Sequence, residues 1–422
     1  MRKRNKGGWW TLTLFAANEI PSAVVTFVAL IMFLQTDKGV AMSTLFASVM
    51  LVPWAAQPLM RRTMPGTGGG RLWLHAAEVS LTLALTVFAL TIGKWKTWMP
   101  AMLLGISWLS AWHDMLARRY YERRTGGNAT EYQDTLRTLA SQMATVLTYG
   151  LMIMAVGVFQ IYFRQRAITY SWALGCYMLA GVYMCLTIIN AMLLTSPGNR
   201  LMPYRRRQPL MLAEQVRQVA VLMLILMPQG MMFYSRTIFL LASPRQGGLG
   251  CTLQEVGFAQ GTIGVIAFLL GVTAGRTMQQ RLGEERMKWP LTVCLGLSPA
   301  VYLAMTWLRP EGAVMLSVYT FLAQAFFGLG LNSCRGYIEK ISGERYRNAV
   351  NPLYIPVISL SILLPMAVSG FLLEKMTYGG FFMLDTLCAP AAWIVMAVML
   401  RGRTGTNNMN NNVCGTEDAE SL

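Results

Sequence analysis

Long runs of apolar residues, separated by short polar segments, extend through most of this chain. A helix of about 20 apolar residues can cross a bilayer, because it satisfies its backbone hydrogen bonds internally. Runs such as 81–92 and 391–400 have no charged face of the kind that a helix in a soluble protein turns to water. The pattern therefore predicts an all-α polytopic membrane protein. The expected spans are residues 10–34, 42–60, 72–92, 98–117, 135–158, 169–194, 215–242, 254–274, 289–308, 312–338, 350–373 and 379–400.

Lysine and arginine residues gather on alternate sides of these expected helices. With the N-terminus placed inside, about 25 of the 36 Lys and Arg residues fall in inside segments and about 8 in outside segments. An error in the number of helices would disrupt this alternation. The alternation continues as far as Arg403. The positive-inside rule therefore predicts about twelve helices in a bacterial inner membrane, with both termini in the cytoplasm.

A long basic loop divides the expected helices into two groups of six. It covers residues 195–213 and separates an N-terminal bundle (1–194) from a C-terminal bundle (214–401). This six-plus-six layout is typical of the major facilitator superfamily, in which two bundles rock about a site near the membrane midplane. Residues 402–422 are polar and Asn-rich, so we expect a disordered tail.

The composition excludes several classes of function. Only 13% of the residues are charged, against about 25% in soluble domains. The net charge of +17 is distributed at loop spacing rather than over one surface, which argues against nucleic-acid binding. No phosphate-binding Gly-x-x-x-x-Gly-Lys-Ser/Thr loop occurs, and the two histidines have no zinc-site spacing. We therefore expect a monomeric carrier without cofactor or metal, whose partners are the bilayer, a small-molecule substrate and protons, and not an enzyme.

Ionisable side chains inside the spans are the candidates for function, because burying charge in a membrane is costly. In the first span, Asn18 and Glu19 precede Pro21, which removes a helix hydrogen bond. One interpretation is a broken helix lining a cavity, with Glu19 as substrate contact or proton carrier. The other is a Glu that simply bonds to a neighbouring helix.

The fourth span carries His113 and Asp114 next to each other, about 100° apart around the helix. Both therefore cannot point into one narrow pocket. Asp114 also precedes Arg118 by four residues, so one reading is a local ion pair. The alternative is a titrating Asp that couples transport to protons.

Further polar residues interrupt the fifth, seventh and tenth spans. Arg137 stays charged in a membrane and needs a carboxylate, carbonyls or an anionic ligand; Asp134 offers a local partner. Arg236 has no local partner and either requires one or reaches outward. The remaining candidate cavity residues are Gln142, Gln229 and Asn332.

Several segments resemble the AmpG-type muropeptide permeases, in a form similar to the Bacteroidetes branch. Their order and spacing along nearly the whole chain carry the resemblance. The segments are 17–21, Pro53-Trp54 and Pro58-Leu59, 111–114, Ser243-Pro244, 247–250, 254–265, 369–371 and 378–382.

This resemblance implies a major facilitator fold and proton-coupled import of anhydromuropeptides, which are cell-wall fragments of an N-acetylglucosamine–anhydro-N-acetylmuramic acid core with a stem peptide. It implies that Asp114 matches an acid of the fourth helix and Arg137 an arginine of the fifth. The chain departs from the pattern at Arg118, where a second acid is usual, and at Gln142 and Gln229, where charged residues are usual.

Two alternatives remain open at this point. The chain is either a transporter of muropeptides or a major facilitator transporter of another organic anion or drug-like molecule. A membrane enzyme or assembly factor would need clustered acids or histidines at one membrane face, and the sequence shows none.

Overall fold

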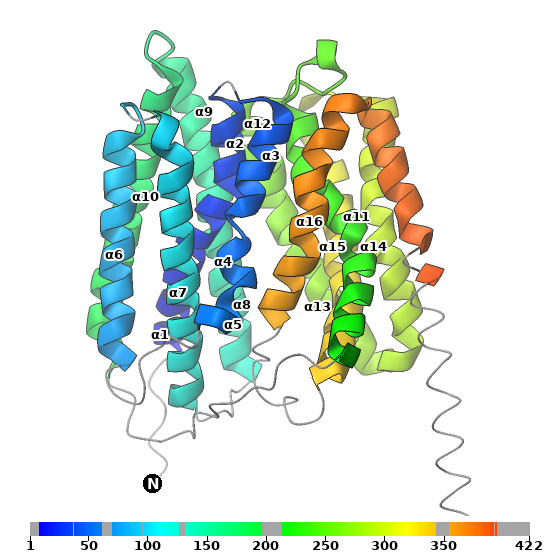
Figure 1. Cartoon of the computed structure of the whole chain (residues 1–422), viewed down its shortest axis with the longest axis horizontal. Helices are drawn as coiled ribbons and strands as arrows, with labels where there is room; N and C mark the ends of the chain where they lie inside the picture. Colours follow the sequence, from blue (N-terminus) through cyan, green and yellow to red (C-terminus); the bar gives the residue numbers. More distant parts are fainter. Residues whose placement is uncertain are drawn as a thin grey trace, which may run out of the picture.

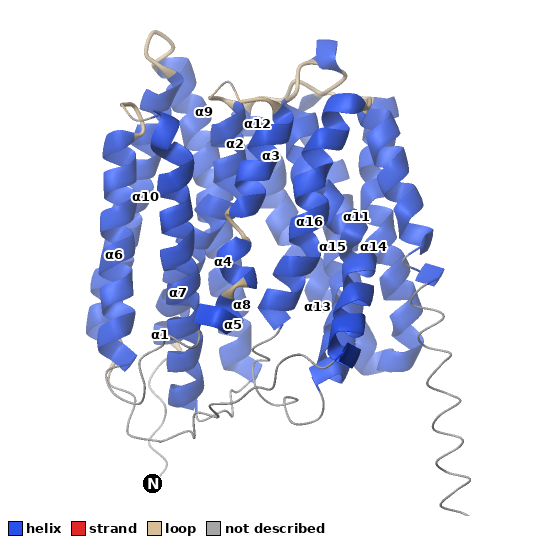
Figure 2. Ribbon diagram, in the orientation of Figure 1, coloured by secondary structure: helices blue, strands red, loops and turns tan. Residues whose placement is uncertain are grey.

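The computed structural model describes residues 8–36, 38–60, 70–94, 96–125, 131–195, 213–342, 354–391 and 393–394. All regular secondary structure within these residues is helical (Figure 2). Nine of the described helices are long and apolar enough to cross a membrane. The expected tail (402–422) and nearly all of the expected loop (195–213) lie outside the described residues.

The first half of the chain forms a bundle of roughly parallel and antiparallel helices (Figure 1). Its elements are α1 (Trp9–Ala23), η1 (Val24–Val28), α2 (Ala29–Leu34), α3 (Val40–Val49), α4 (Val52–Ala55), α5 (Gln57–Met60), α6 (Gly70–Thr91), η3 (Lys96–Trp98), α7 (Met99–Thr125), α8 (Glu131–Thr145), η4 (Val146–Leu151), α9 (Met152–Tyr162) and α10 (Ile168–Leu193). Some of these elements are consecutive parts of one long helix. For example, α1, η1 and α2 together form the candidate span Trp9–Leu34.

The second half forms a bundle beside the first (Figure 1). Its elements are α11 (Ala213–Leu241), η5 (Pro244–Gln246), α12 (Leu253–Val256), η6 (Gly257–Gly264), α13 (Val265–Leu282), α14 (Glu284–Leu308), α15 (Gly312–Ser342) and α16 (Tyr354–Lys375), followed by helical residues 378–391. The predicted all-α architecture of two bundles with about twelve spans is confirmed.

Three of the predicted spans, the second, fourth and twelfth, are not described as long, continuous apolar helices. The second is divided into α3, α4 and α5, with Pro53 and Pro58 near the starts of the last two pieces. The fourth, α7, is helical throughout but ends in charged turns that contain Arg123 and Arg124. Only the first part of the twelfth, residues 378–391, is described without interruption. None of these three spans is among the nine long apolar helices.

Wide π-helical turns interrupt three spans: η1, η4 and η6. Such turns leave backbone groups displaced from the regular ladder and are frequent at functional sites. The first follows Pro21, whose missing N–H already weakens the regular pattern. The other two lie where η4 and η6 contact each other across the two bundles.

The bundles join along two seams. In one, α3 packs on α16, and the backbone N–H of Ala41 donates to Glu374 Oε1 over 2.8 Å. In the other, η4 and α9 pack on η6 and α12. Glycines permit this second approach: a Cβ on Gly261 would lie 2.4 Å from the carbonyl carbon of Tyr149. Both seams lie toward the end of the molecule opposite the N-terminus (Figure 1).

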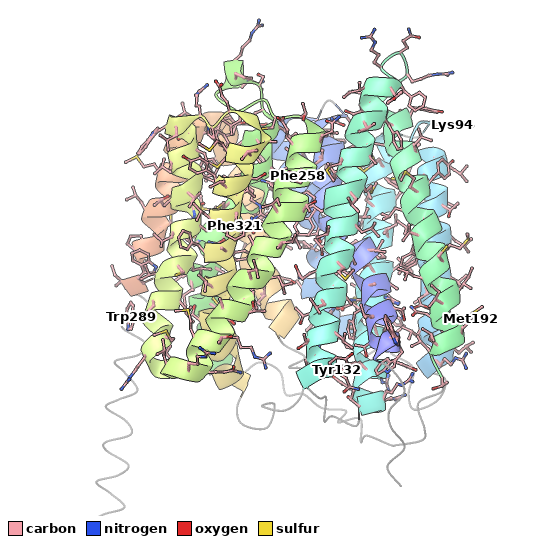
Figure 3. The ribbon with its side chains drawn as sticks, turned by 180° about the vertical axis from the view of Figure 1, so that it is seen from behind. Lys94, Tyr132, Met192, Phe258, Trp289 and Phe321 are labelled. Atoms are coloured by element: carbon pink, nitrogen blue, oxygen red, sulfur yellow. The ribbon has the colours of Figure 1, made fainter. Side chains whose placement is uncertain are left out.

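The outer surface is apolar, as a lipid-facing surface must be. Phe258 and Phe321 project from it in Figure 3 and are 41% and 37% exposed. The same view places Lys94 at one end of the molecule and Met192 at the other. Large apolar side chains therefore cover the spans on the outside, while the polar side chains discussed next lie within.

Candidate functional site

A polar cavity of about 220 Å³ lies inside the N-terminal bundle. Four elements line it: α1, α4, α7 and α8. The lining residues are Phe15, Asn18, Glu19, Ser22, Trp54, Asp114, Arg118, Arg137 and Ser141. Four of the residues predicted from the sequence (Asn18, Glu19, Asp114 and Arg137) therefore share one cavity, although they come from three different spans.

Asp114 is the most strongly bound group in this cavity. Arg118 contacts it through both Nε and a terminal nitrogen, with the shortest distance 2.7 Å. Asn18 donates to Oδ1 over 2.9 Å, and Gln57 of α5 donates to Oδ2 over 2.9 Å. The local ion pair expected at this spacing therefore forms, and two further helices also donate to the same carboxylate. This arrangement fixes the relative positions of α1, α5 and α7.

The guanidinium of Arg137 lies beside two aromatic rings. Its guanidinium carbon lies 4.8 Å from the centre of the Phe15 ring and 5.8 Å from that of Tyr121, within the range of cation–π attraction. The nearby Asp134 accepts a hydrogen bond from the Tyr121 hydroxyl instead. No carboxylate of the described residues forms an ion pair with Arg137. A cation with aromatic neighbours and no bound acid can receive an anionic group.

Glu19 and Trp54 form further parts of the wall. Glu19 is half-buried in α1, two residues before Pro21 and five residues before the π-helical turn begins at Val24. Trp54 contributes a mostly buried indole from the short helix α4. The cavity thus combines carboxylates, arginine cations and a flat aromatic surface.

Three predicted site residues lie elsewhere. Gln142 is half-buried in α8 and does not line the cavity. Gln229 donates to the backbone carbonyl of Leu295 over 2.6 Å and so joins α11 to α14. Asn332 donates to the carbonyl of Val272 over 3.1 Å, which joins α15 to α13. The last two amides satisfy backbone groups between helices of the C-terminal bundle.

A second polar cluster lies where the bundles meet. Tyr149 of η4 donates to the Gln260 side chain of η6 and lies 3.2 Å from the Thr237 hydroxyl of α11. Arg236, beside Thr237, is buried, and its Nε has no hydrogen-bond partner among the described residues. The sequence left open whether Arg236 needs a partner inside the protein or reaches outward. The Arg236 guanidinium lies over the Phe233 ring and does not reach outward.

The sequence reasoning missed a group of polar residues behind the cavity. Glu78 of α6 is fully buried and bonds to His75 and Asn190, and His113 lies 3.6 Å from it. The signal was present, because Glu78 is an acid in the middle of the third apolar run. Among the described residues, no group of three or more His, Cys, Asp or Glu side chains is arranged to hold a metal ion.

Comparison with known proteins places this geometry in context. No family model matches the chain. The anhydromuropeptide permease of Escherichia coli (strain K12) is 21% identical over 373 residues, which cover 86% of this chain and 72% of the permease.

Solved structures of transporters share the fold. The nucleoside transporter NupG superposes with a TM-score of 0.64 at 13% identity, over 92% of this chain and 98% of that one. A bacterial homologue of the human drug peptide transporters PepT1 and PepT2 superposes with a TM-score of 0.66 at 11% identity, over 93% and 98%. These relatives are transporters and not enzymes. The chain therefore shares the fold of these transporters, and nine of its described helices are long and apolar enough to cross a membrane.

Proposed function

We propose that this protein imports muropeptides of the N-acetylglucosamine–anhydro-N-acetylmuramyl type across the bacterial inner membrane, coupled to the entry of protons. The likeness to an anhydromuropeptide permease over 86% of the chain supports the substrate class. The observation that carries the proposal is the cavity, in which Arg137 lies beside a polar wall and forms no ion pair with a carboxylate of the described residues.

The chemistry of such a substrate fits the cavity. A muropeptide carries hydroxyls, amides and carboxylates, and each of these needs a partner once it leaves water. Arg137 would bind a carboxylate, Asn18 and Ser141 would bond to amides or hydroxyls, and Trp54 would pack on a sugar face. A volume of about 220 Å³ accommodates one polar end of the molecule, so the remainder would lie between the bundles. Gln142, Gln229 and Asn332 remain candidates for contacts with that remainder.

The two seams support a direction for the open state. They join the bundles toward the end opposite the N-terminus, so the cavity would face the N-terminal side. With the termini in the cytoplasm, as the distribution of Lys and Arg predicts, this state would release substrate inward. Glu19 and Asp114 would be the cavity acids that respond to proton binding.

Uptake of labelled anhydromuropeptide tests the proposal directly. Cells that produce the protein should accumulate the label, and cells that lack it should not, because no other route would carry so polar a molecule through the bilayer. Equal uptake in both would contradict the proposal. Accumulation of a different organic anion or drug-like compound instead would favour the alternative transporter.

Substitution of Arg137 tests the substrate contact. Losing a hydrogen bond to a charged group costs about 1.5–3 kcal/mol, so Arg137→Gln should weaken muropeptide binding by about ten- to a hundredfold. The affinity of Arg137→Lys should lie between those of wild type and Arg137→Gln, because a lysine keeps the positive charge but cannot form two parallel hydrogen bonds to a carboxylate. Binding to the purified protein can be measured by calorimetry.

Two controls sharpen this measurement. Arg164→Gln removes the same charge from the exposed loop after α9 and should not change binding. A muropeptide whose carboxylates are amidated should bind wild type and Arg137→Gln with equal affinity. Equal loss of affinity for both ligands would mean that Arg137 supports the fold rather than the substrate.

A further inference from the structure

Behind the cavity, a chain of buried polar groups runs through the N-terminal bundle. His113 Nδ1 lies 3.2 Å from Asn18 Oδ1, and His113 Nε2 lies 3.6 Å from Glu78 Oε1. The side chains of Glu78 and His113 are fully buried. Asn18 belongs to both systems, because its amide nitrogen donates to Asp114 in the cavity. The buried pair and the cavity carboxylate are therefore two hydrogen bonds apart.

The hydrogen-bonding atoms define where protons sit. Asn18 presents its nitrogen to the Asp114 carboxylate, so its oxygen faces His113. An amide oxygen only accepts, so His113 Nδ1 must carry a hydrogen. The contact with Asn18 therefore places a hydrogen on Nδ1 of His113.

Hydrogen bonds also define the tautomer of His75, on the other side of Glu78. Arg71 Nε donates to His75 Nε2 over 3.3 Å, so the hydrogen of His75 is on Nδ1, which faces Glu78 Oε2 at 3.1 Å. Asn190 donates to Glu78 Oε1 over 2.7 Å. Glu78 therefore accepts from two donors, as a carboxylate does.

One position remains between the two residues. His113 Nε2 faces the Glu78 carboxylate and has no other partner among the described residues. A bare nitrogen lone pair against a buried carboxylate would be repulsive, whereas a proton there makes an ion pair inside a medium of low dielectric. The contact therefore requires one proton between His113 Nε2 and the Glu78 carboxylate.

Other groups face this pair from every helix packed around it. They are Asn18 of α1, Arg71 and His75 of α6, Asp114 of α7, and Tyr183 and Asn190 of α10. The Tyr183 hydroxyl and Asn190 Oδ1 have no hydrogen-bond partner among the described residues. The side chain of His75, which contacts Glu78, is 19% exposed.

We propose that Glu78 and His113 bind the coupling proton of this transporter. The proposal rests on the function proposed above and assigns its proton to a site outside the substrate cavity. When the proton leaves for water, the His113 imidazolium becomes an imidazole. The Glu78 carboxylate then loses its counter-charge, and the contact between His113 and Asn18 must readjust. Because Asn18 also holds Asp114, that readjustment reaches the cavity.

The protonation state can be observed without any substrate. The whole chain contains two histidines, so ¹⁵N-histidine labelling of the purified protein gives two pairs of ring-nitrogen signals by NMR, which His75→Asn assigns. In wild type we expect both ring nitrogens of His113 to be protonated. In Glu78→Gln, where no carboxylate faces Nε2, we expect only Nδ1 to be protonated. A bare Nε2 in wild type would overturn the proposal.

Transport separates this site from substrate binding. In vesicles with a pH gradient of about one unit, coupling to one proton supports about tenfold accumulation, since one pH unit corresponds to a factor of ten. Glu78→Gln should abolish this accumulation of labelled anhydromuropeptide and retain exchange of labelled for unlabelled anhydromuropeptide. Accumulation at the wild-type level in Glu78→Gln would refute the assignment. Glu311→Gln, an exposed acid in the loop between α14 and α15, is the matched control.

The two experiments fail independently. If wild type moves no anhydromuropeptide at all, the proposed substrate is wrong, while the NMR result still decides whether Glu78 and His113 hold a proton. If wild type accumulates the substrate but His113 has a bare Nε2, the substrate stands and the proton site is wrong.

Discussion

Replacing Asp114 with asparagine is expected to abolish gradient-driven uptake. The carboxylate accepts hydrogen bonds from Arg118, Asn18 and Gln57, and an amide can present only one oxygen to these three donors. The substitution also leaves the Arg118 guanidinium without its counter-charge. Breaking a buried ion pair in this way costs about 3–5 kcal/mol, and the loss falls on the groups that connect α1, α5 and α7.

The measurement must separate loss of transport from loss of folding. Uptake of labelled anhydromuropeptide is measured beside the thermal midpoint of the purified protein. We expect uptake to fall to the level of cells without the protein, while the protein remains inserted and helical. Adding Arg118→Leu to Asp114→Asn should restore part of the lost stability but not uptake. Wild-type uptake in Asp114→Asn would remove Asp114 from the mechanism.

The second large effect is expected at the seam between η4 and η6. Alanine at Gly261 would place its Cβ 2.4 Å from the carbonyl carbon and oxygen of Tyr149 and 2.5 Å from Gly150 Cα. These are backbone atoms, which cannot rotate away as a side chain can, so the two helices must separate. Overpacking of this kind typically costs about 1–3 kcal/mol.

The consequence extends beyond stability. Separation of η4 from η6 would also strain the contact of Tyr149 with Gln260 and Thr237. We expect Gly261→Ala to lower both the thermal midpoint and the uptake rate, because the state with this seam closed becomes less populated. Gly181→Ala in α10 is the matched control, since a Cβ there meets nothing within 4 Å. Equal behaviour of the two variants would contradict the role assigned to the seam.

Much of the cavity could be anticipated from single residues. Asn18, Glu19, Asp114 and Arg137 are polar groups inside apolar runs, and such groups are costly enough in a membrane to require a purpose. The same rule applies to Glu78 and Arg236, which shows that the rule identifies candidates without ranking them. Spacing also predicted the pair of Asp114 with Arg118, because residues four apart on a helix are neighbours.

Partners from distant segments could not be anticipated. Gln57 bonds to Asp114 although the two lie in different spans, and Asn190 bonds to Glu78 although 112 positions separate them in the sequence. Gln229 and Asn332 looked like cavity residues, yet each bonds to a backbone carbonyl of a neighbouring helix. A polar side chain inside a span faces either a ligand or another helix, and periodicity alone does not distinguish the two.

The sequence by itself determined the number of spans, their division into two bundles and several of the buried ionisable residues. These follow from local physics, because each span must satisfy its own backbone in lipid and each isolated charge is costly there. Only the tertiary structure decided which of these residues meet. The side-chain contacts of Asp114, of Glu78 with His113, and of Gly261 with Tyr149 depend on how whole helices pack, and packing is set by many residues at once.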